Sequence, residues 1–226
     1  MKPLLTRVES VLFDLDGTLV ETNIDFPLMK RKVVSLAVEY GMDSSELLTL
    51  DTLVIVDLTV HCLQSQGSSS QAHEMRCRAM DLLEEIELKH AHCTQEIPYA
   101  QKLVSELKNR NISIGIVTRN CRKASEISLG ITSICPDVLI CREDATRHKP
   151  HPEQIIKALE TLGAQPESSI MVGDHTMDVA SGKSAGLKTI GFLREYRPAG
   201  FFDKIAPDFV ATNLREVLSA VIRCDS

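Results

Sequence analysis

The stretch Val11-Leu12-Phe13-Asp14-Leu15-Asp16-Gly17-Thr18-Leu19 determines how the rest of the chain is interpreted. Its apolar beginning ends at two carboxylates one residue apart, and a Gly-Thr pair follows. This pattern predicts a buried strand that runs into a tight polar turn. In open sheets of parallel strands, ligands bind just beyond the carboxyl ends of the strands. We therefore expect Asp14 and Asp16 to lie in a functional site, where backbone N–H groups of the turn face an anion.

The composition is that of a globular protein of ordinary polarity. The 226 residues are 43% hydrophobic and 25% charged, enough for one large domain or for a core with a smaller second domain. The net charge of −6 argues against nucleic acid or a membrane surface as a partner, because both are bound through clustered Lys and Arg. No stretch approaches the roughly 20 apolar residues of a membrane span, and the first residues lack the apolar segment of a signal peptide. We expect a cytoplasmic protein, either a monomer or a homodimer.

The cysteines are scattered and contain no Cys-x-x-Cys pair, which predicts reduced and mostly buried thiols. They are Cys62, Cys77, Cys93, Cys121, Cys135, Cys141 and Cys224. The run His90-x-His92-Cys93 has the residue types of a transition-metal site. Without a fourth ligand it is less typical of a zinc site than of ordinary side chains.

Residues 22–92 have the pattern of an all-helical domain. Apolar residues at helical spacing predict helices over residues 29–40 and 72–86. Asp43 and Glu46 form a capping box for a further helix through Leu63. The many β-branched residues of 53–60 leave a strand possible there.

From Pro98 onward, predicted helices and strands alternate. The strands are expected over 112–117, 138–141, 169–172, 187–192 and 208–211, and the helices over 99–110, 120–129, 152–162 and 176–185 and after Asn213. This alternation predicts parallel strands joined by right-handed crossovers. The expected fold is an α/β, doubly wound parallel sheet in a Rossmann-like three-layer core. That core comprises residues 1–21 and 93–226, with the helical domain of residues 22–92 inserted after its first strand.

Further polar residues follow the predicted strands or lie in the loops between elements. Thr118 ends one strand, Asp174 and Asp178 follow another, and Lys149-Pro150 lies in a loop. Because the carboxyl ends of parallel strands share one edge, we expect these side chains to converge with those of the first turn. Several carboxylates gathered with one lysine suit a hard ion such as Mg²⁺.

These residues resemble, in order, the four motifs of the haloacid dehalogenase-like hydrolase superfamily, and the resemblance covers nearly the whole chain. The motif Asp-x-Asp-Gly-Thr is present as residues 14–18, the strand-ending Thr as Thr118, the Lys-Pro pair as Lys149-Pro150, and Gly-Asp-x-x-x-Asp as residues 173–178. The helical domain resembles the mobile cap of phosphoglycolate phosphatase-like members. Residues 18–22 and 93–98 are then the expected hinges of the cap.

The resemblance implies a Mg²⁺-dependent phosphatase that acts on a small phosphorylated metabolite similar to phosphoglycolate. Asp14 would be the nucleophile that forms an aspartyl-phosphate, and Asp16 the acid and base. The implied metal ligands are Asp14, Asp16 through its backbone carbonyl, Asp174, and Asp178 as a ligand or as support for one. The implied phosphate-binding groups are Leu15, Gly17, Thr118, Arg119 and Lys149.

There are two alternatives to this function. A phosphomutase similar to β-phosphoglucomutase has the same core and cap type. A non-catalytic binding or regulatory module could have kept the fold, but the intact set Asp14, Asp16, Thr118, Lys149 and Asp174 argues against it, because an unused site need not keep all its groups. Asp16 argues against dehalogenation, because the dehalogenases of the superfamily lack an Asp at this place. Arg119 and His175 depart from the residues common at these places in the family. Residues 97–100 also depart, because they lack a Gly that is frequent where the chain returns from the cap. The basic residues of the helical domain that are candidates for binding a second anionic group are Lys30, Arg31, Lys32, Arg76 and Arg78.

Overall fold

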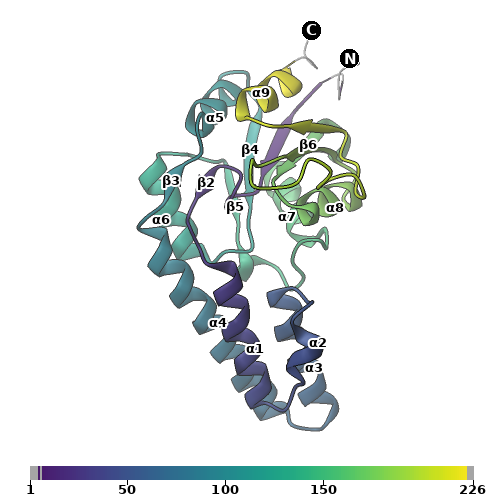
Figure 1. Cartoon of the computed structure of the whole chain (residues 1–226). Helices are drawn as coiled ribbons and strands as arrows, with labels where there is room; N and C mark the ends of the chain where they lie inside the picture. Colours follow the sequence, from purple (N-terminus) through teal and green to yellow (C-terminus); the bar gives the residue numbers. More distant parts are fainter. Residues whose placement is uncertain (1–4, 6, 223–226) are drawn as a thin grey trace. The chain divides into compact units, whose positions relative to one another are not determined.

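The computed structural model describes residue 5 and residues 7–222, so that Cys224 lies outside the described residues. The chain divides into two compact units. The core unit comprises the described residues of Met1–Thr22 and Ala91–Ser226, and the helical unit comprises Asn23–His90. Figure 1 follows the chain through both units, from purple at the N-terminus to yellow at the C-terminus.

Within the described residues, the core unit holds a sheet of six strands in the order β5-β4-β1-β6-β7-β8. These strands are β1 (Ser10–Phe13), β4 (Ser113–Val117), β5 (Val138–Ile140), β6 (Ser169–Gly173), β7 (Lys188–Phe192) and β8 (Phe209–Ala211). All neighbouring pairs are parallel, and Phe13 of β1 is in register with Ile116 of β4 and Val172 of β6. The predicted doubly wound parallel sheet is confirmed, with β1 between the two halves of the winding.

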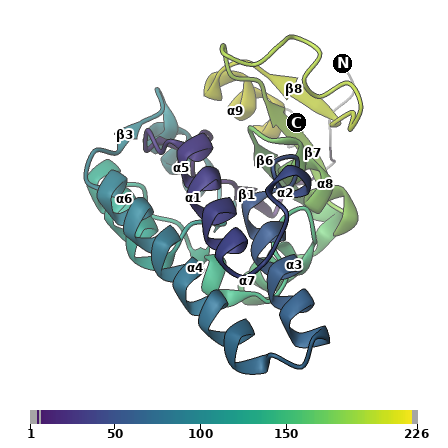
Figure 2. The ribbon, with the colours of Figure 1, turned by 60° about the horizontal axis from the view of Figure 1, so that its bottom comes forward.

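Helices cover both faces of this sheet (Figure 2). They are α5 (Ala100–Lys108), α6 (Arg122–Thr132), α7 (Glu153–Leu162), α8 (Thr176–Ser184) and α9 (Leu214–Ile222). Because successive side chains of a strand alternate in direction, Val11 and Phe13 share one buried cluster with residues of α5 and α9. Leu12 belongs to a different cluster, which contains residues of α7. Each strand of the centre is thus buried on both faces, which explains its continuous apolar sequence.

Some short elements of the core unit differ from the sequence expectation. We expected Asn120 to cap the helix that follows it, but Cys121 is the cap residue of α6, and its Sγ accepts from the Ala124 N–H at 3.5 Å. The two-residue strands β2 (Val20–Glu21) and β3 (Gln95–Glu96) pair antiparallel and were not predicted, because so short a pair has no periodicity. The 3₁₀ turns η1 (Arg142–Asp144) and η2 (Pro166–Ser168) were also not predicted.

The helical unit contains α1 (Phe26–Glu39), α2 (Ser44–Leu47), α3 (Thr52–Ser65) and most of α4 (Ser69–Ala91). The prediction of one helix from Asp43 to Leu63 is wrong, because the Asp51 carboxylate accepts from the Leu53 N–H at 3.0 Å and begins a new helix. The alternative of a strand over residues 53–60 is also wrong. The β-branched residues of α3 instead contribute to the buried cluster of this unit.

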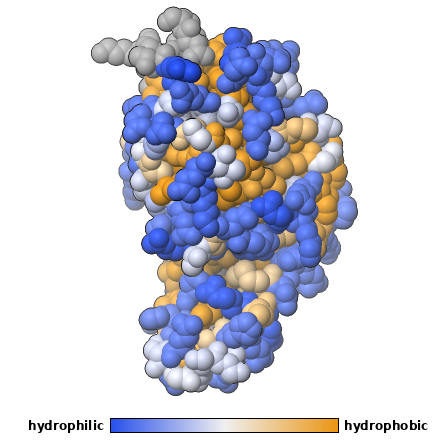
Figure 3. All heavy atoms as spheres, turned by 180° about the vertical axis from the view of Figure 1, so that it is seen from behind, coloured by the Kyte–Doolittle hydropathy of each residue, from blue (hydrophilic) through white to orange (hydrophobic). Residues whose placement is uncertain are grey.

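The surface of the protein is mixed in polarity on one face (Figure 3), and most of its described thiols are not buried. Figure 3 shows a face on which hydrophobic side chains lie between hydrophilic ones. Among the described helices, none combines the length and the apolar character needed to cross a membrane. The described cysteines are free thiols, but only Cys121 and Cys141 are buried, so the expectation of mostly buried thiols is wrong.

Candidate active site

Three adjacent strands deliver the predicted site residues to one edge of the sheet. Asp14 follows β1, Thr118 follows β4, and Asp174 follows β6, and β1 lies between the other two strands. The Asp14 N–H donates to the Val172 carbonyl at 2.9 Å, which continues the pairing of β1 with β6 up to the site. The topology of the sheet therefore brings together residues that are 160 positions apart in the sequence, Asp14 and Asp174.

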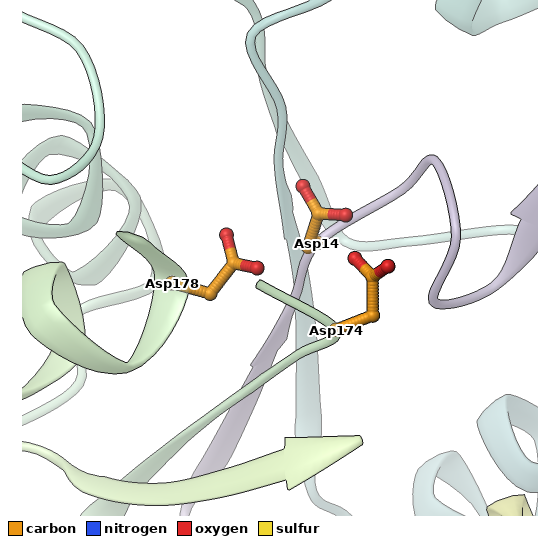
Figure 4. A group of neighbouring side chains, drawn as sticks. All are labelled: Asp14, Asp174 and Asp178. Atoms are coloured by element: carbon orange, nitrogen blue, oxygen red, sulfur yellow. The ribbon is translucent and has the colours of Figure 1, made fainter. Parts of the chain in front are cut away.

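Asp14, Asp174 and Asp178 form an acidic triad in which the three carboxylates point toward a common centre (Figure 4). One oxygen of each carboxylate lies within 4.8 Å of the others. All three residues are buried. Asp178 comes from the first turn of α8, four residues after Asp174, so that both reach the same side of the sheet edge.

Lys149 is the buried cation of this site. Its Nζ donates to Asp14 Oδ1 at 2.5 Å and lies 2.7 Å from Asp178 Oδ1. The third donation goes to the Val117 carbonyl at 2.8 Å, at the end of β4. Because an ammonium group has three N–H bonds, these contacts fix its position completely.

The three carboxylates of the triad share one ammonium group, and the pKa values of Asp14 and Asp174 are raised as a result of burial and of the neighbouring negative charges. Burial raises the pKa of Asp14 well above its usual value; the charges of Asp178 and Asp174 raise it further, and Lys149 only partly offsets them. Burial and the charge of Asp178 raise the pKa of Asp174 to about 6. Burial alone would lower the pKa of Lys149, but Asp14 and Asp178 outweigh it, so that the pKa is raised and the lysine stays protonated.

Asp16 is held apart from the triad by two donors. The Thr22 hydroxyl donates to its Oδ1 at 2.7 Å, and the Asn120 amide donates to its Oδ2 at 3.2 Å. Both hydrogen bonds favour the ionised carboxylate, but burial is the larger effect and raises the pKa of Asp16. A raised pKa suits a group that must both give and take a proton near neutral pH.

Thr118 is fixed by the backbone and by Gln154. Its Oγ1 accepts from the Asn120 N–H at 3.0 Å, which leaves the hydroxyl proton able to donate. Gln154 is fully buried, and its amide donates to the carbonyls of Thr118 at 2.8 Å and Cys141 at 3.0 Å. The Lys149 N–H donates to the other end of the same side chain at 3.4 Å. Gln154 therefore links the segments that carry Thr118 and Lys149.

The turn after β1 depends on Gly17, which has a φ of +88°. A Cβ at this position would lie 2.6 Å from Asp174 Oδ2, so only glycine lets the turn approach the triad. The Gly17 N–H donates to the Val20 carbonyl at 2.7 Å and is therefore occupied, although we expected it to bind phosphate. The same role for the N–H groups of Leu15 and Arg119 stays a prediction.

Several contributors to the site were not predicted in that role. The Tyr196 hydroxyl lies 3.3 Å from Asp174 Oδ2, and the guanidinium of Arg194 donates to the Gly17 carbonyl at 2.6 Å and to Glu21 at 2.7 Å. These residues and Gln154 belong to no motif, and their side-chain directions have no signal in the sequence. Thr22 and Asn120 were noted only as a hinge residue and a helix cap.

Other candidates are not assembled into a site. Among the described residues, the acidic triad is the one group of three or more possible metal-binding residues, so His90, His92 and Cys93 do not form one. In the helical unit, Arg76 pairs with Asp57 at 2.8 Å and Arg78 with Glu39 at 2.7 Å. Both arginines are therefore engaged in surface ion pairs.

The triad fits a divalent cation. Three buried carboxylates with one lysine leave an excess of negative charge, and carboxylate oxygens are the donors that Mg²⁺ prefers. Asp14 and Asp174 are the better ligands, because Asp178 is already bound by Lys149 through Oδ1 and by the His175 N–H through Oδ2 at 3.0 Å. Asp178 thereby restrains Lys149 and the start of α8.

Known proteins are similar to this chain in sequence and in fold. A family model described as haloacid dehalogenase-like hydrolase matches residues 11–192. Pyrophosphatase PpaX of Bacillus mycoides is 31% identical over 96% of this chain and 98% of its own length. A solved haloacid dehalogenase-like hydrolase of Bacteroides fragilis, described as putative in its name, superposes with a TM-score of 0.68 at 22% identity, covering 93% of this chain and all of that one. A family hydrolase of Deinococcus radiodurans, solved with bound phosphate and sodium, has a TM-score of 0.65 at 23% identity, covering 97% of each chain.

The matching region contains the acidic residues, Thr118 and Lys149 together, and it extends over both units. The predicted resemblance is thus confirmed by sequence and by fold. The chain belongs to the family of haloacid dehalogenase-like hydrolases.

Proposed function

We propose that this hydrolase is a Mg²⁺-dependent phosphatase in which Asp14 is the nucleophile. The observation that carries the proposal is the position of the Asp14 carboxylate, 2.5 Å from Lys149 Nζ and next to Asp174 in the triad. A carboxylate placed between a fixed ammonium group and a cation site can approach a phosphoryl dianion without prohibitive repulsion.

The reaction would proceed in two displacements at phosphorus. In the first, an Asp14 oxygen forms a bond to phosphorus while the bond to the leaving oxygen breaks, and Asp16 gives its proton to that oxygen. In the second, Asp16 takes a proton from water, whose oxygen attacks phosphorus and releases Asp14. The hydroxyl of Thr118 would donate to a phosphoryl oxygen, and the ammonium group of Lys149, held against Asp14, would offset the negative charge of the phosphoryl group through both displacements.

Mg²⁺ would be held by Asp14, Asp174 and the backbone carbonyl of Asp16, with Asp178 as a second-layer residue. When bound, the ion supplies positive charge that offsets the repulsion between the Asp14 carboxylate and the phosphoryl oxygens. It would also offset the effect of burial and neighbouring acids, which raises the pKa of Asp14.

The substrate would be a small phosphorylated compound. The similarity to pyrophosphatases over nearly the full chain favours pyrophosphate as the first substrate to test, followed by phosphoglycolate and sugar phosphates. We propose that the helical unit, Asn23–His90, is the cap domain and that it selects among these compounds.

The test is release of phosphate from these compounds with Mg²⁺ and with a chelator. Activity that needs Mg²⁺ and falls by at least about three orders of magnitude in Asp14→Asn supports the proposal. Comparable activity in the variant and the native protein would exclude Asp14 as the nucleophile. Retention of the phosphate on the product, rather than its release, would favour the phosphomutase alternative.

A further inference from the structure

The loop that follows β7, residues 193–206, contacts Asp174 and the residue after it. The Tyr196 hydroxyl contacts the Asp174 carboxylate, at 3.3 Å. Further along the loop, the ring of Phe201 packs edge-on against the imidazole of His175, the residue after Asp174, with 5.7 Å between ring centres. The loop therefore approaches Asp174 both at its carboxylate and at the next residue of the chain.

Arg197 is held between these two contacts. Its guanidinium carbon lies 4.5 Å from the centre of the Phe201 ring and 5.3 Å from that of Tyr196. Two aromatic rings thus lie close to the guanidinium and favour its position between them. Tyr196, whose hydroxyl contacts the Asp174 carboxylate at 3.3 Å, directly precedes Arg197, so the guanidinium belongs to the part of the loop that lies against Asp174.

Arg197 has one side-chain donor without a partner among the described residues. Its Nε is buried and has no hydrogen-bond partner in the described part of the chain. The neighbouring Arg194 differs, because its guanidinium is neutralised by Glu21 at 2.7 Å. A buried donor without a partner is costly, which indicates that something outside the chain completes its hydrogen bonding.

The charges of the site indicate what that partner is. If Mg²⁺ is bound as proposed, its two positive charges and the one on Lys149 would balance the three carboxylates of the triad, so a phosphoryl dianion would enter a site with no further positive charge. The guanidinium of Arg197, next to the residue that contacts Asp174, adds positive charge to this end of the site. An arginine opposes the binding of a cation nearby unless an anion lies against both. Guanidinium groups bind phosphate oxygens well, since their N–H geometry matches the spacing of those oxygens.

We propose that Arg197 is a specificity-determining residue that binds a second anionic group of the substrate, the distal phosphoryl group of a diphosphate. The proposal rests on the proposed function, because it assigns the first phosphoryl group to Asp14, Thr118 and Lys149. It places selection for diphosphates partly in the core unit, in the loop after β7.

The test compares Arg197→Ala with Arg197→Lys and with a matched control, Arg215→Ala. Arg215 is an exposed arginine of α9 that lies over another tyrosine ring, Tyr99, at 4.4 Å. For each protein, KM is measured with pyrophosphate and with p-nitrophenyl phosphate in the presence of Mg²⁺. Calorimetry then measures binding of methylenediphosphonate and of inorganic phosphate, which needs no turnover.

In Arg197→Ala we expect KM for pyrophosphate and the dissociation constant of methylenediphosphonate to rise about tenfold or more, the range of a charge-assisted hydrogen bond. The values for p-nitrophenyl phosphate and inorganic phosphate should change less than about twofold, as should all values in Arg215→Ala. Arg197→Lys should recover part of the loss, because it keeps the charge without the planar group.

Equal losses for the one-phosphate and two-phosphate compounds would overturn the proposal, because Arg197 would then act on the metal or on the fold. No loss for methylenediphosphonate would overturn it as well. If the native protein binds methylenediphosphonate but turns over neither substrate, the proposed function fails and the calorimetry still decides the role of Arg197.

Discussion

The ammonium group of Lys149 is shared by Asp14 and Asp178, so its loss would leave two buried carboxylates without their cation. In Lys149→Met we expect kcat to fall by about 10²- to 10³-fold, as when one preorganised donor to a developing charge is removed. We also expect the free energy of unfolding to fall by about 3 kcal/mol, because unpaired buried charges are costly. Phosphate-release kinetics and denaturant unfolding measure the two effects, and the exposed Lys157→Met is the matched control. Full activity in Lys149→Met would contradict the assigned role.

The sequence was most informative for residues that follow strands. Asp14, Thr118 and Asp174 could be placed together because parallel strands end at one edge, whatever the details of packing. The supporting residues Gln154 and Tyr196 could not be predicted, since their roles depend on where a side chain points after the helices and loops have packed. Gln154 looks like any polar helix residue in the sequence, yet it is fully buried between two strand ends.

At the scale of elements, the junction of β6 and α8 is the tightest part of the site. A Cβ on Gly173 would lie 2.3 Å from the Cβ of Asp178, so Gly173→Ala must push the first turn of α8 away from the strand. We expect a loss of stability of about 1–3 kcal/mol, typical of overpacking, and a loss of activity because Asp178 also holds Lys149. Thermal unfolding and kcat test this, with Gly130→Ala, which meets nothing within 4 Å, as the control. An unchanged unfolding temperature would mean that the turn is not constrained as described.

The Asp208 carboxylate lies just before β8 and binds residues at the start of β7. Burial alone would raise the pKa of Asp208, but Lys188 at 2.7 Å and the N–H and hydroxyl of Thr189 outweigh it, so that the pKa lies below 3.8. A lowered pKa stabilises the fold fully above 3.8, and the contribution is lost as the pH falls through the folded-state value. Asp208→Asn should therefore cost about 1–2 kcal/mol at pH 7 and much less near pH 2. Denaturant unfolding at both pH values, beside the exposed Asp81→Asn, measures this, and an equal cost at both would contradict it.

The prediction of elements failed where local signals were in conflict. The cap signal at Asp43 was correct, since its carboxylate accepts from the Ser45 N–H at 2.9 Å, but the helix ends at Leu47. A second cap, Asp51, follows four residues later and was hidden inside an apolar pattern that continues through it. The β-branched residues of α3 favour strands only weakly, and tertiary packing in the helical unit overrides that preference.

At the scale of the whole molecule, a bound metal ion would join Asp14 at the end of β1 to Asp174 at the end of β6. These two residues lie next to each other only in the folded chain. Mg²⁺ at about 100 times its dissociation constant should therefore stabilise the protein by about 2.7 kcal/mol, a rise in Tm of roughly 5–10 °C. Because burial and Asp178 raise the pKa of Asp174 to about 6, its carboxyl takes up a proton below that pH and the stabilisation should decline. Thermal unfolding with and without Mg²⁺ from pH 5 to 8 tests this. A shift that persists in Asp174→Asn would place the ion elsewhere.

Glu21 and Gln95 are register partners in the β2–β3 pair, so the chain leaves the core unit and re-enters it at two residues that face each other. For the core unit, the residues between Glu21 and Gln95 therefore act as one long loop, because the β2–β3 pairing holds the two ends of that loop together. The entropy of closing a loop grows only slowly with its length, so the core is almost indifferent to how much chain is inserted here. Arg194, from the loop after β7, strengthens this closure because its guanidinium donates to the Gly17 carbonyl and to the Glu21 carboxylate. The insertion can therefore be exchanged, lengthened or trimmed by evolution or by design, as an interchangeable part, while the edge of the sheet that carries the acidic triad keeps its geometry.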